Sequence, residues 1–388
     1  MLKPIFDITK IGIDYKMCSL PMPDIDAHKY QPSVEFTQEQ IDSYTTDFCH
    51  PYVVYVPEGW NGHKWWMANT PFPNANAVFE NACIFYADDQ ENGDAPVLWH
   101  GIDANPIVKA RDSNSNNCDP ILFIENNIGY VFTRDNLYSG HPYYKAQIST
   151  DGHTWTQRPD GGASGSEARE VIEDPGKGKW TNVPVGCMGS GSLIKENEKY
   201  KLFGWFGREG KTGNPLVNTG RSAGIFCGEC DELTNKEYDY TGRVGTIGKD
   251  WVNPWHCHIF KDGETYYVLG FCYDTKNHTD GIYLAVSKDG MKNISWYPRP
   301  LFVRDSDVSF YKPSALLIGR KLLVYGTIKF NGRPSNIMGG IFADANNYPR
   351  GEADIPKDFN GRHSLPFMFS IDFDKLVYML EQDNMIIG

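Results

Sequence analysis

The chain has 388 residues, of which 40% are hydrophobic and 14% aromatic, and 37 Lys and Arg against 49 Asp and Glu give a formal net charge of −12. Because nucleic-acid binding depends on clustered basic residues, this acidic balance argues against a nucleic-acid partner. Abundant aromatics together with 38 Gly and 24 Pro favour many short strands joined by turns, and exclude coiled coil and disorder.

The chain has no run of about 18 apolar residues that could span a membrane, and its start lacks the apolar core of a signal peptide. We therefore expect synthesis in a cytoplasm and no membrane insertion. Nine cysteines, an odd number in a chain large enough to form a core, fit reduced thiols better than a disulfide framework.

A repeated unit dominates the chain: a polar residue opens a short apolar strand, a turn follows, and an aromatic-rich strand returns. The opening residues of the five units are His50, Asp119, Ser190, His256 and Lys312. Their separations of 69, 71, 66 and 56 residues are typical of repeated supersecondary units. We expect the inner strands to begin near residues 51, 120, 191, 257 and 313.

A third strand and an Asp-Gly turn recur at 146–152 and 284–290, followed by Trp155 and Trp296. Asp-Gly favours a hairpin because Gly takes the positive φ that a tight turn needs. Four strands in each of five units predict an all-β fold, a five-bladed β-propeller.

The propeller is predicted to cover residues 46–345, with an N-terminal extension at 1–45 and a C-terminal closing segment at 346–388. A strand from Ile5–Asp14 or from Phe367–Phe373 would close the ring and remove an exposed edge. The candidate helices are Thr37–Tyr44 and Phe373–Glu381.

The run from His50 to Pro71 (HPYVVYVPEGWNGHKWWMANTP), with Glu80-Asn81 behind it, resembles five-bladed propellers related to glycoside hydrolase family 43. The similarity covers roughly residues 45–345 and extends to propeller modules of tailed-phage receptor-binding proteins. It implies recognition of a cell-surface or soluble glycan, by a homo-oligomer or a virion assembly. The expected location is a phage tail or other virion, and otherwise the cytoplasm.

In a propeller the innermost strands line the central channel, so the five opening residues are expected at one mouth. Convergent polar groups there favour a polyol site, and Trp255, Trp65 or Trp66 could supply a platform for a sugar ring. The alternatives are that the polar residues hydrate a closed channel and that the tryptophans pack in the core.

A second ring of polar residues opens the third strands: Glu80, Arg221 and Asp280. Glu80 and Arg221 could instead form a structural ion pair with each other or with Asp119. The predicted glycan-binding residues are therefore His50, Asp119, His256, Lys312, Arg221 and Trp255.

The resemblance implies an Asp base in the first blade, a supporting Asp in the second and a Glu acid in the third. Only Asp119 matches, because His50 and Ser190 occupy the other two positions. Our hypothesis is therefore glycan recognition. The alternatives are an active glycoside hydrolase that uses Glu80 and Asp119, or a histidine as proton donor, and a structural propeller that serves as a spacer or docking surface.

The sequence predicts no cofactor. Cys227 and Cys230 have the spacing of a zinc half-site, but a second pair is missing, so unrelated thiols or a redox disulfide are the alternatives. A divalent cation such as calcium in the channel, held by Asp119 and a histidine through waters, stays open.

Overall fold

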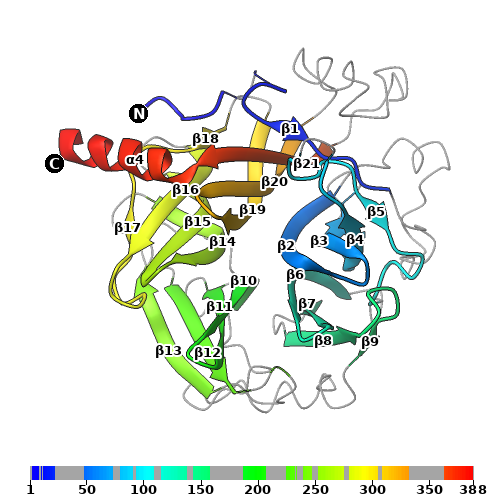
Figure 1. Cartoon of the computed structure of the whole chain (residues 1–388). Coiled ribbons are helices and arrows are strands. Elements are labelled where there is room, and N and C mark those ends of the chain that lie inside the picture. Colours follow the sequence, from blue (N-terminus) through cyan, green and yellow to red (C-terminus); the bar gives the residue numbers. More distant parts are fainter. Residues whose placement is uncertain are drawn as a thin grey trace.

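Five antiparallel sheets stand around a common axis, and each sheet is one blade of a β-propeller (Figure 1). The predicted fold class is confirmed. The computed structural model describes residues 2–7, 10, 12–21, 48–72, 79–90, 93–108, 115–137, 143–157, 187–206, 224–231, 233, 239–246, 252–274, 279–304, 308–331 and 362–387.

Four blades are built from consecutive strands, ordered from the axis outward. The first blade contains β2 (Phe48–Trp60), β3 (His63–Pro71), β4 (Cys83–Ala87) and β5 (His100–Gly101). The second contains β6 (Ser115–Glu125), β7 (Ile128–Leu137), β8 (Tyr143–Ser149) and β9 (Thr156–Gln157). The third contains β10 (Cys187–Glu196), β11 (Lys199–Phe206), β12 (Gly224–Cys230) and β13 (Asp239–Thr246). The fourth contains β14 (Val252–Asp262), β15 (Thr265–Asp274), β16 (Thr279–Ser287) and β17 (Ser295–Trp296), and β18 (Phe302–Val303) also pairs with β16.

The fifth blade joins the two ends of the chain: β19 (Val308–Ile318), β20 (Lys321–Asn331), β21 (Arg362–Asp372) and β1 (Lys16–Met17). The predicted closing strand at 367–373 overlaps β21. In the N-terminal segment the pairing residues are 16–17. In the alternative closing segment at 5–14, Ile5 and Phe6 instead donate backbone hydrogen bonds to the carbonyls of Pro300 and Leu301.

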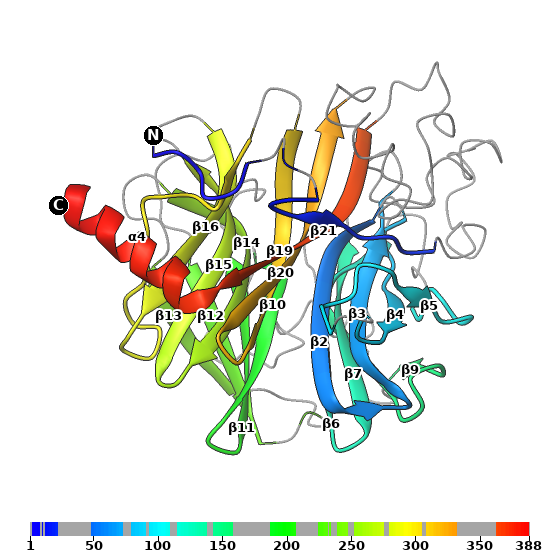
Figure 2. The ribbon, with the colours of Figure 1, turned by 45° about the horizontal axis from the view of Figure 1, so that its top comes forward.

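Helix α4 (Phe373–Ile387) follows β21 directly (Figure 2) and confirms the helix expected from Phe373. The other candidate helix, 37–44, lies outside the described residues. Within the described part of the chain, no helix has the length and apolar character needed to cross a membrane.

Each innermost strand contains an irregularity close to the residue that was predicted to open it. The pairing register shifts between Cys49 and Tyr52, Cys118 and Ile121, Met188 and Ser192, Pro254 and His256, and Tyr311 and Ser314. The strands begin three to five residues earlier than predicted, so the predicted starts were wrong. Each inner strand pairs before its bulge as well as after it, and the predicted starts lie close to the bulge. His50 and Asp119 have positive φ values of 65° and 54°, which non-glycine residues adopt rarely and which often mark a functional position.

Serines just beyond the bulges tie neighbouring blades together. The Ser192 hydroxyl accepts a hydrogen bond from the Ile259 amide at 2.7 Å, and the Ser314 hydroxyl accepts one from the Val53 amide at 3.1 Å. Both serines are buried. These bonds satisfy backbone donors that have no neighbouring strand on that side, and they fix the spacing of the inner strands around the axis.

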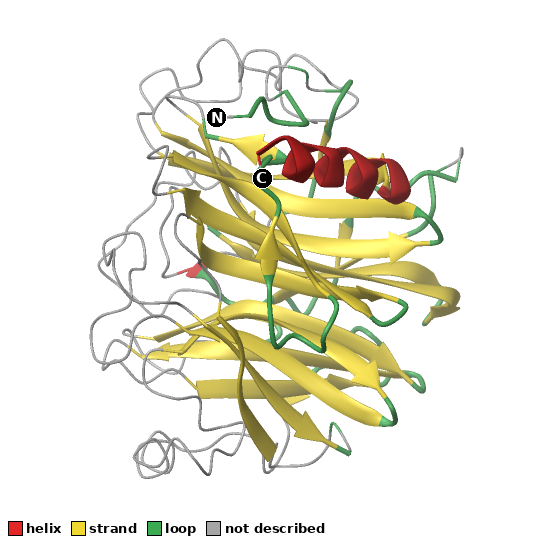
Figure 3. Ribbon diagram, turned by 90° about the vertical axis from the view of Figure 1, so that its left-hand side faces the viewer, coloured by secondary structure: helices red, strands yellow, loops and turns green. Residues whose placement is uncertain are grey.

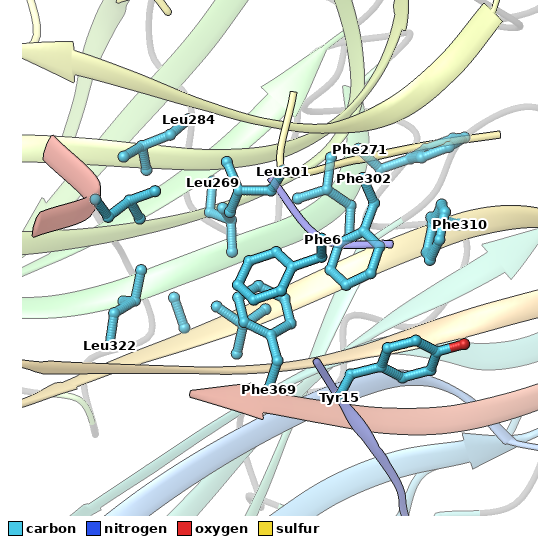
Figure 4. Close-up of a cluster of buried hydrophobic side chains, with 14 of the residues drawn as sticks. Phe6, Tyr15, Leu269, Phe271, Leu284, Leu301, Phe302, Phe310, Leu322 and Phe369 are labelled. Carbon is cyan, nitrogen blue, oxygen red and sulfur yellow. The ribbon is translucent and has the colours of Figure 1, made fainter. Parts of the chain in front are cut away.

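Apolar side chains fill the spaces between blades. Phe6 of the N-terminal segment stacks on Phe302 and packs at a tilt against Phe369, with ring centroids 5.0 and 4.2 Å apart (Figure 4), which anchors the segment between the fourth and fifth blades. Trp66 packs against the predicted turn at Gly152, where a Cβ would lie 2.4 Å from the indole. Trp65 and Trp66 are buried in the core, which agrees with the core-packing alternative.

The two ends of the propeller differ. The turns that join the first and second strands of the blades gather at one end, on the right in Figure 3. The bulges lie near the start of the inner strands and therefore near the opposite end. We refer to these as the hairpin end and the bulge end.

Candidate functional site

Four of the five predicted opening residues meet on the axis at the bulge end. His50 Nε2 lies 3.5 Å, His256 Nδ1 3.7 Å and Lys312 Nζ 4.0 Å from the same oxygen, Asp119 Oδ1. All four residues are at most 3% exposed. Their side chains come from β2, β6, β14 and β19, so the equivalent repeat position does place them together.

Three predicted residues lie outside this description. Arg221 is outside the described residues, and the side chains of Ser190 and Trp255 are as well, although their backbones lie in β10 and β14. The predicted roles of these residues in glycan binding therefore stay predictions.

Asp119 is ionised although it is buried. Burial alone would raise its pKa, but the cations Arg134 and Lys312 hold the pKa well below its ordinary value. Arg134 Nη2 lies 2.9 Å from Asp119 Oδ2 and donates to Cys118 Sγ at 3.1 Å. Arg134, which was not predicted from the sequence, pairs with Cys118 in the β6–β7 register.

Both histidines are neutral. Burial lowers the pKa of His50 to about 3, against the opposing effect of Asp119, and burial lowers the pKa of His256 well below its ordinary value. A neutral imidazole keeps one nitrogen lone pair, which is the form that binds a metal ion.

The neighbours of His50 bear on its tautomer. The Thr70 hydroxyl donates to the Cys49 carbonyl at 2.9 Å, so at 3.2 Å its oxygen can accept from His50 Nδ1. The Cys49 thiol donates to Glu80 Oε1 at 3.4 Å, and that oxygen lies 3.7 Å from Nδ1. These contacts are compatible with a proton on Nδ1, and in that tautomer the lone pair of Nε2 faces the Asp119 carboxylate.

Glu80, which the sequence placed in the second ring, belongs to this cluster. Burial, reinforced by the charge of Asp119, raises its pKa to about 7. Asp280 of that ring pairs instead with Arg304 at 3.3 Å in the fourth blade, where burial raises its pKa to about 6.

The donor atoms of His50, Asp119 and His256 fit a metal ion. They all lie within 4.8 Å of one another, and two donors about 2.1 Å from a tetrahedral ion would lie about 3.4 Å apart. His50 Nε2 is buried without a hydrogen-bond partner among the described residues. Two imidazoles and a carboxylate favour a first-row transition ion over calcium, which prefers oxygen ligands. The Thr70 contact to Nδ1 is the kind of supporting hydrogen bond that metal-ligating histidines usually have.

An aromatic and cationic group borders this cluster. Lys329 Nζ lies 3.4 Å from the centroid of the Tyr311 ring and 4.6 Å from that of Phe72. The Tyr311 ring in turn contacts the rings of His50 and His256, with centroids 5.2 and 4.4 Å apart. Lys329 and Tyr311 are half-buried.

Below the cluster, Tyr52 and His258 lie two residues further along their strands, with ring centroids 4.9 Å apart. Burial lowers the pKa of His258 to about 3. On the far side lies a cavity of about 320 Å³, lined mainly by apolar residues of all five inner strands. In the third blade, Cys227 is buried and forms no disulfide, and the Cys230 side chain lies outside the described part.

Comparisons with known proteins identify the fold. No family model matches the chain, and a search of curated proteins gives no match. Among solved structures, an N-acetylgalactosamine deacetylase from F. plautii in complex with blood group B trisaccharide has 15% identity and a TM-score of 0.60, covering 95% of this chain and 98% of its own.

Two glycoside hydrolases are also similar in structure. A family 117 enzyme of the marine bacterium Zobellia galactanivorans has 14% identity and a TM-score of 0.50, over 93% of this chain and 91% of its own. A family 32 β-fructofuranosidase of Bombyx mori has 8% identity and a TM-score of 0.50, over 85% and 63%. These likenesses show a shared glycoside hydrolase-like propeller fold. They give no support to the phage receptor-binding part of the resemblance.

Proposed function

We propose that this chain is a metal-dependent hydrolase that acts on a glycan, with one divalent first-row ion held by His50, Asp119 and His256. The observation that carries the proposal is the convergence of two imidazole nitrogens on one buried carboxylate: His50 Nε2 lies 3.5 Å and His256 Nδ1 3.7 Å from Asp119 Oδ1. With the proton of His50 on Nδ1, the Nε2 lone pair would face the carboxylate, and a cation between the two groups would relieve their repulsion. The three donors lie within 4.8 Å of one another.

The bond we propose for cleavage is the amide of an N-acetylated amino sugar. The deacetylase propeller supports this choice because it matches nearly all of both chains, with a higher TM-score than the glycoside hydrolases described above. Glycosidic cleavage is less well supported. The His50 ring approaches Glu80 with Nδ1 and Asp119 with Nε2, so it stands between the two carboxyl groups where a glycosidic bond would have to lie.

A bound divalent ion would supply Lewis-acid polarisation of the amide carbonyl and a lower pKa for water. Arg134 holds Asp119 in its ionised form through the contact at 2.9 Å. Thr70 keeps the proton of His50 on Nδ1, so that Nε2 is available as a ligand. Glu80, whose pKa burial raises to about 7, has the acidity expected of a group that accepts and returns a proton near neutral pH.

A second candidate is glycan recognition without hydrolysis, the function predicted from the sequence, at a phage tail or other virion. One observation favours it. The Lys312 ammonium lies 4.0 Å from Asp119 Oδ1 and can neutralise the carboxylate without an ion. Lys312 also donates to the Pro120 carbonyl at 3.5 Å, which fixes it at the axis.

The test is acetate release from oligosaccharides that contain N-acetylgalactosamine or N-acetylglucosamine, using chelator-stripped chain with and without added Zn²⁺, Mn²⁺ or Co²⁺. We expect acetate only with an added ion, and a loss of about 10²–10⁴-fold in turnover for Glu80→Gln. The exposed His153→Gln serves as the matched control and should keep full activity.

Reducing-sugar release from the same samples separates the alternatives. Release of reducing ends that is abolished by Glu80→Gln would favour the glycosidase. Glycan binding without either product, whichever ion is added, would favour the recognition function. Acetate release that persists in chelator would contradict the metal-dependent proposal.

A further inference from the structure

A second group of metal-ligating side chains lies beside the proposed centre, at the other nitrogen of His50. Cys49 Sγ lies 3.3 Å from His50 Nδ1 and 3.4 Å from Glu80 Oε1. His50 Nδ1 and Glu80 Oε1 are 3.7 Å apart. The three donor atoms all lie within 4.8 Å of one another. His50 therefore belongs to two sets of donors, one through Nε2 and one through Nδ1.

The spacing of these donors suits a small ion. A thiolate sulfur, an imidazole nitrogen and a carboxylate oxygen, each about 2.0–2.3 Å from a tetrahedral ion, would lie about 3.3–3.6 Å apart. The three observed separations, 3.3, 3.4 and 3.7 Å, are close to that range. The Thr70 hydroxyl oxygen lies 3.2 Å from His50 Nδ1 and 3.5 Å from Cys49 Sγ, so it can complete a set of four ligands.

The first blade alone supplies this second set. Cys49 and His50 lie at the bulge of β2, and Cys49 pairs with Thr70 of β3. Glu80 lies shortly before β4. The side chains are buried, with Cys49 0%, His50 2% and Glu80 6% exposed. Burial and a shared blade hold the three donors at fixed positions, which a metal site requires.

The thiol determines which ion fits this set. Thiolate and imidazole ligands suit Zn²⁺ and its common substitute Co²⁺, whereas Mn²⁺ prefers oxygen-rich sites. Binding of the ion would release the Cys49 thiol proton and the His50 Nδ1 proton to solvent. Because two protons leave and both ions share the His50 ring, the second ion should bind more weakly than the first. At low free concentration the chain then holds one ion.

We infer that Cys49, His50 and Glu80 form a second, weaker ion site that takes Zn²⁺ in preference to Mn²⁺, and that its occupation inhibits the reaction. The site stands on the geometry of these residues. The inhibition rests on the proposed function, in which Glu80 accepts and returns a proton. An ion bound to Glu80 Oε1 occupies the carboxylate that this step uses, so excess zinc would act as an inhibitor.

The test is a Co²⁺ titration of reduced, chelator-stripped chain, followed by absorption and by equilibrium dialysis. We expect one tight equivalent and then a weaker one. Only the second should bring the sulfur-to-cobalt charge-transfer absorption in the near ultraviolet, which a site of nitrogen and oxygen ligands lacks. Uptake of a single equivalent by the parent chain at every Co²⁺ concentration would overturn the inference.

Variants assign the second equivalent to its ligands. Cys49→Ser should remove the charge-transfer absorption and weaken the second equivalent by more than about 100-fold. Glu80→Gln should also weaken the second equivalent and keep the first. Cys83→Ser is the matched control, because Cys83 is a buried thiol of the same blade that donates to the Asn81 carbonyl at 3.5 Å, and it should behave like the parent. Absorption that survives Cys49→Ser would overturn the inference.

Acetate release gives a second readout. The rate in excess Zn²⁺ should fall about 10²–10⁴-fold below the rate at one equivalent, which is the loss expected for Glu80→Gln. Excess Mn²⁺ should cause no such fall, and in Cys49→Ser the ratio of the two Zn²⁺ rates should return toward unity. An equal fall with both ions, or the same fall in Cys49→Ser, would contradict inhibition through this site.

The second site and the proposed function fail separately. His256→Ala lacks a ligand of the first site and keeps all three of the second, so it should still show the cobalt–sulfur absorption. If that absorption appears but no ion supports acetate release, the proposed function fails and the second site stands. If one equivalent supports acetate release and no Co²⁺ concentration gives the absorption, the inference fails and the proposed function stands.

Discussion

The two ends of the propeller both join neighbouring blades through charged residues, but they bury those charges to different degrees. At the bulge end, the side chains of Asp119 and Lys312 are each 1% exposed. At the hairpin end, three acidic residues end the inner strands of the second, third and fourth blades, and each pairs with a cation of the next blade. The pairs are Glu125 with Lys195, Glu196 with Lys261, and Asp262 with Arg320. These acidic side chains are 21%, 14% and 35% exposed.

The difference in burial means that the charges at the two ends have different effects on stability. Water and salt screen the hairpin-end pairs, so each contributes little to stability, and together they set the register between blades. Charges buried at the bulge end lose their hydration and remain tolerable only when every partner is present. Such a cluster contributes little net stability to the fold, which agrees with a role in binding or catalysis.

Removing a partner at the bulge end should have the largest effect on stability. Arg134→Met deletes the guanidinium 2.9 Å from Asp119 Oδ2 and leaves a buried carboxylate with weaker partners, so we expect a loss of about 3 kcal/mol in the free energy of unfolding. Urea denaturation measures it. The double variant Asp119→Asn with Arg134→Met should recover part of the loss, and additive losses would contradict the coupling.

Protonation of the buried His258 should give an intermediate effect. Its pKa is about 3 in the folded chain and about 6.5 when unfolded, so below pH 6.5 the unfolded chain binds a proton that the folded chain does not. The folded state is therefore destabilised relative to the unfolded state as pH falls from about 6.5 toward 3. Between pH 7 and pH 5 the parent chain should lose about 2 kcal/mol more than His258→Gln. The exposed His153→Gln should follow the parent, and equal losses for all three chains would refute the assignment.

The smallest effect is expected at the hairpin end. Glu196 accepts hydrogen bonds from Lys201, Lys261 and the Tyr266 hydroxyl, which lower its pKa to about 2 against the effect of burial. Glu196→Gln should cost about 1 kcal/mol at low ionic strength and less in 1 M salt. A loss as large as that of Arg134→Met, or one that salt leaves unchanged, would remove the distinction between the two ends.

Sequence patterning predicted the blades because each unit repeats a polar residue, an apolar strand and a turn. It failed at the start of the inner strands, because a bulge interrupts the pairing and looks like a strand end. The pairing of β1 with β21, which closes the ring, was only partly predicted. The strand β1 contains only Lys16 and Met17, and two residues cannot show a periodic pattern. The repeats of a propeller sequence thus predict its fold, while its irregular positions depend on contacts between distant segments.

The repeat also predicted part of the candidate site. His50, Asp119, His256 and Lys312 occupy equivalent positions in the repeat, so their convergence followed from the fold. Arg134 and Lys329 lie on second strands and reach the cluster only through strand register, opposite Cys118 and Ser309. Arg134 pairs with Cys118, where the register of the second blade shifts, so a charged residue opposite the start of a bulge is the sequence signal that would have found it.

Binding of a metal ion tests the central claim most directly. Chelator-stripped chain should take up one Co²⁺ per molecule in equilibrium dialysis. His50→Ala and His256→Ala should each weaken uptake by more than about 100-fold, since the loss of a ligand costs more than the 10–100-fold typical of a supporting residue. His258→Gln, two residues beyond His256 on the same strand, should bind like the parent. Absence of uptake by the parent chain, or full uptake by His256→Ala, would contradict a centre built from His50, Asp119 and His256.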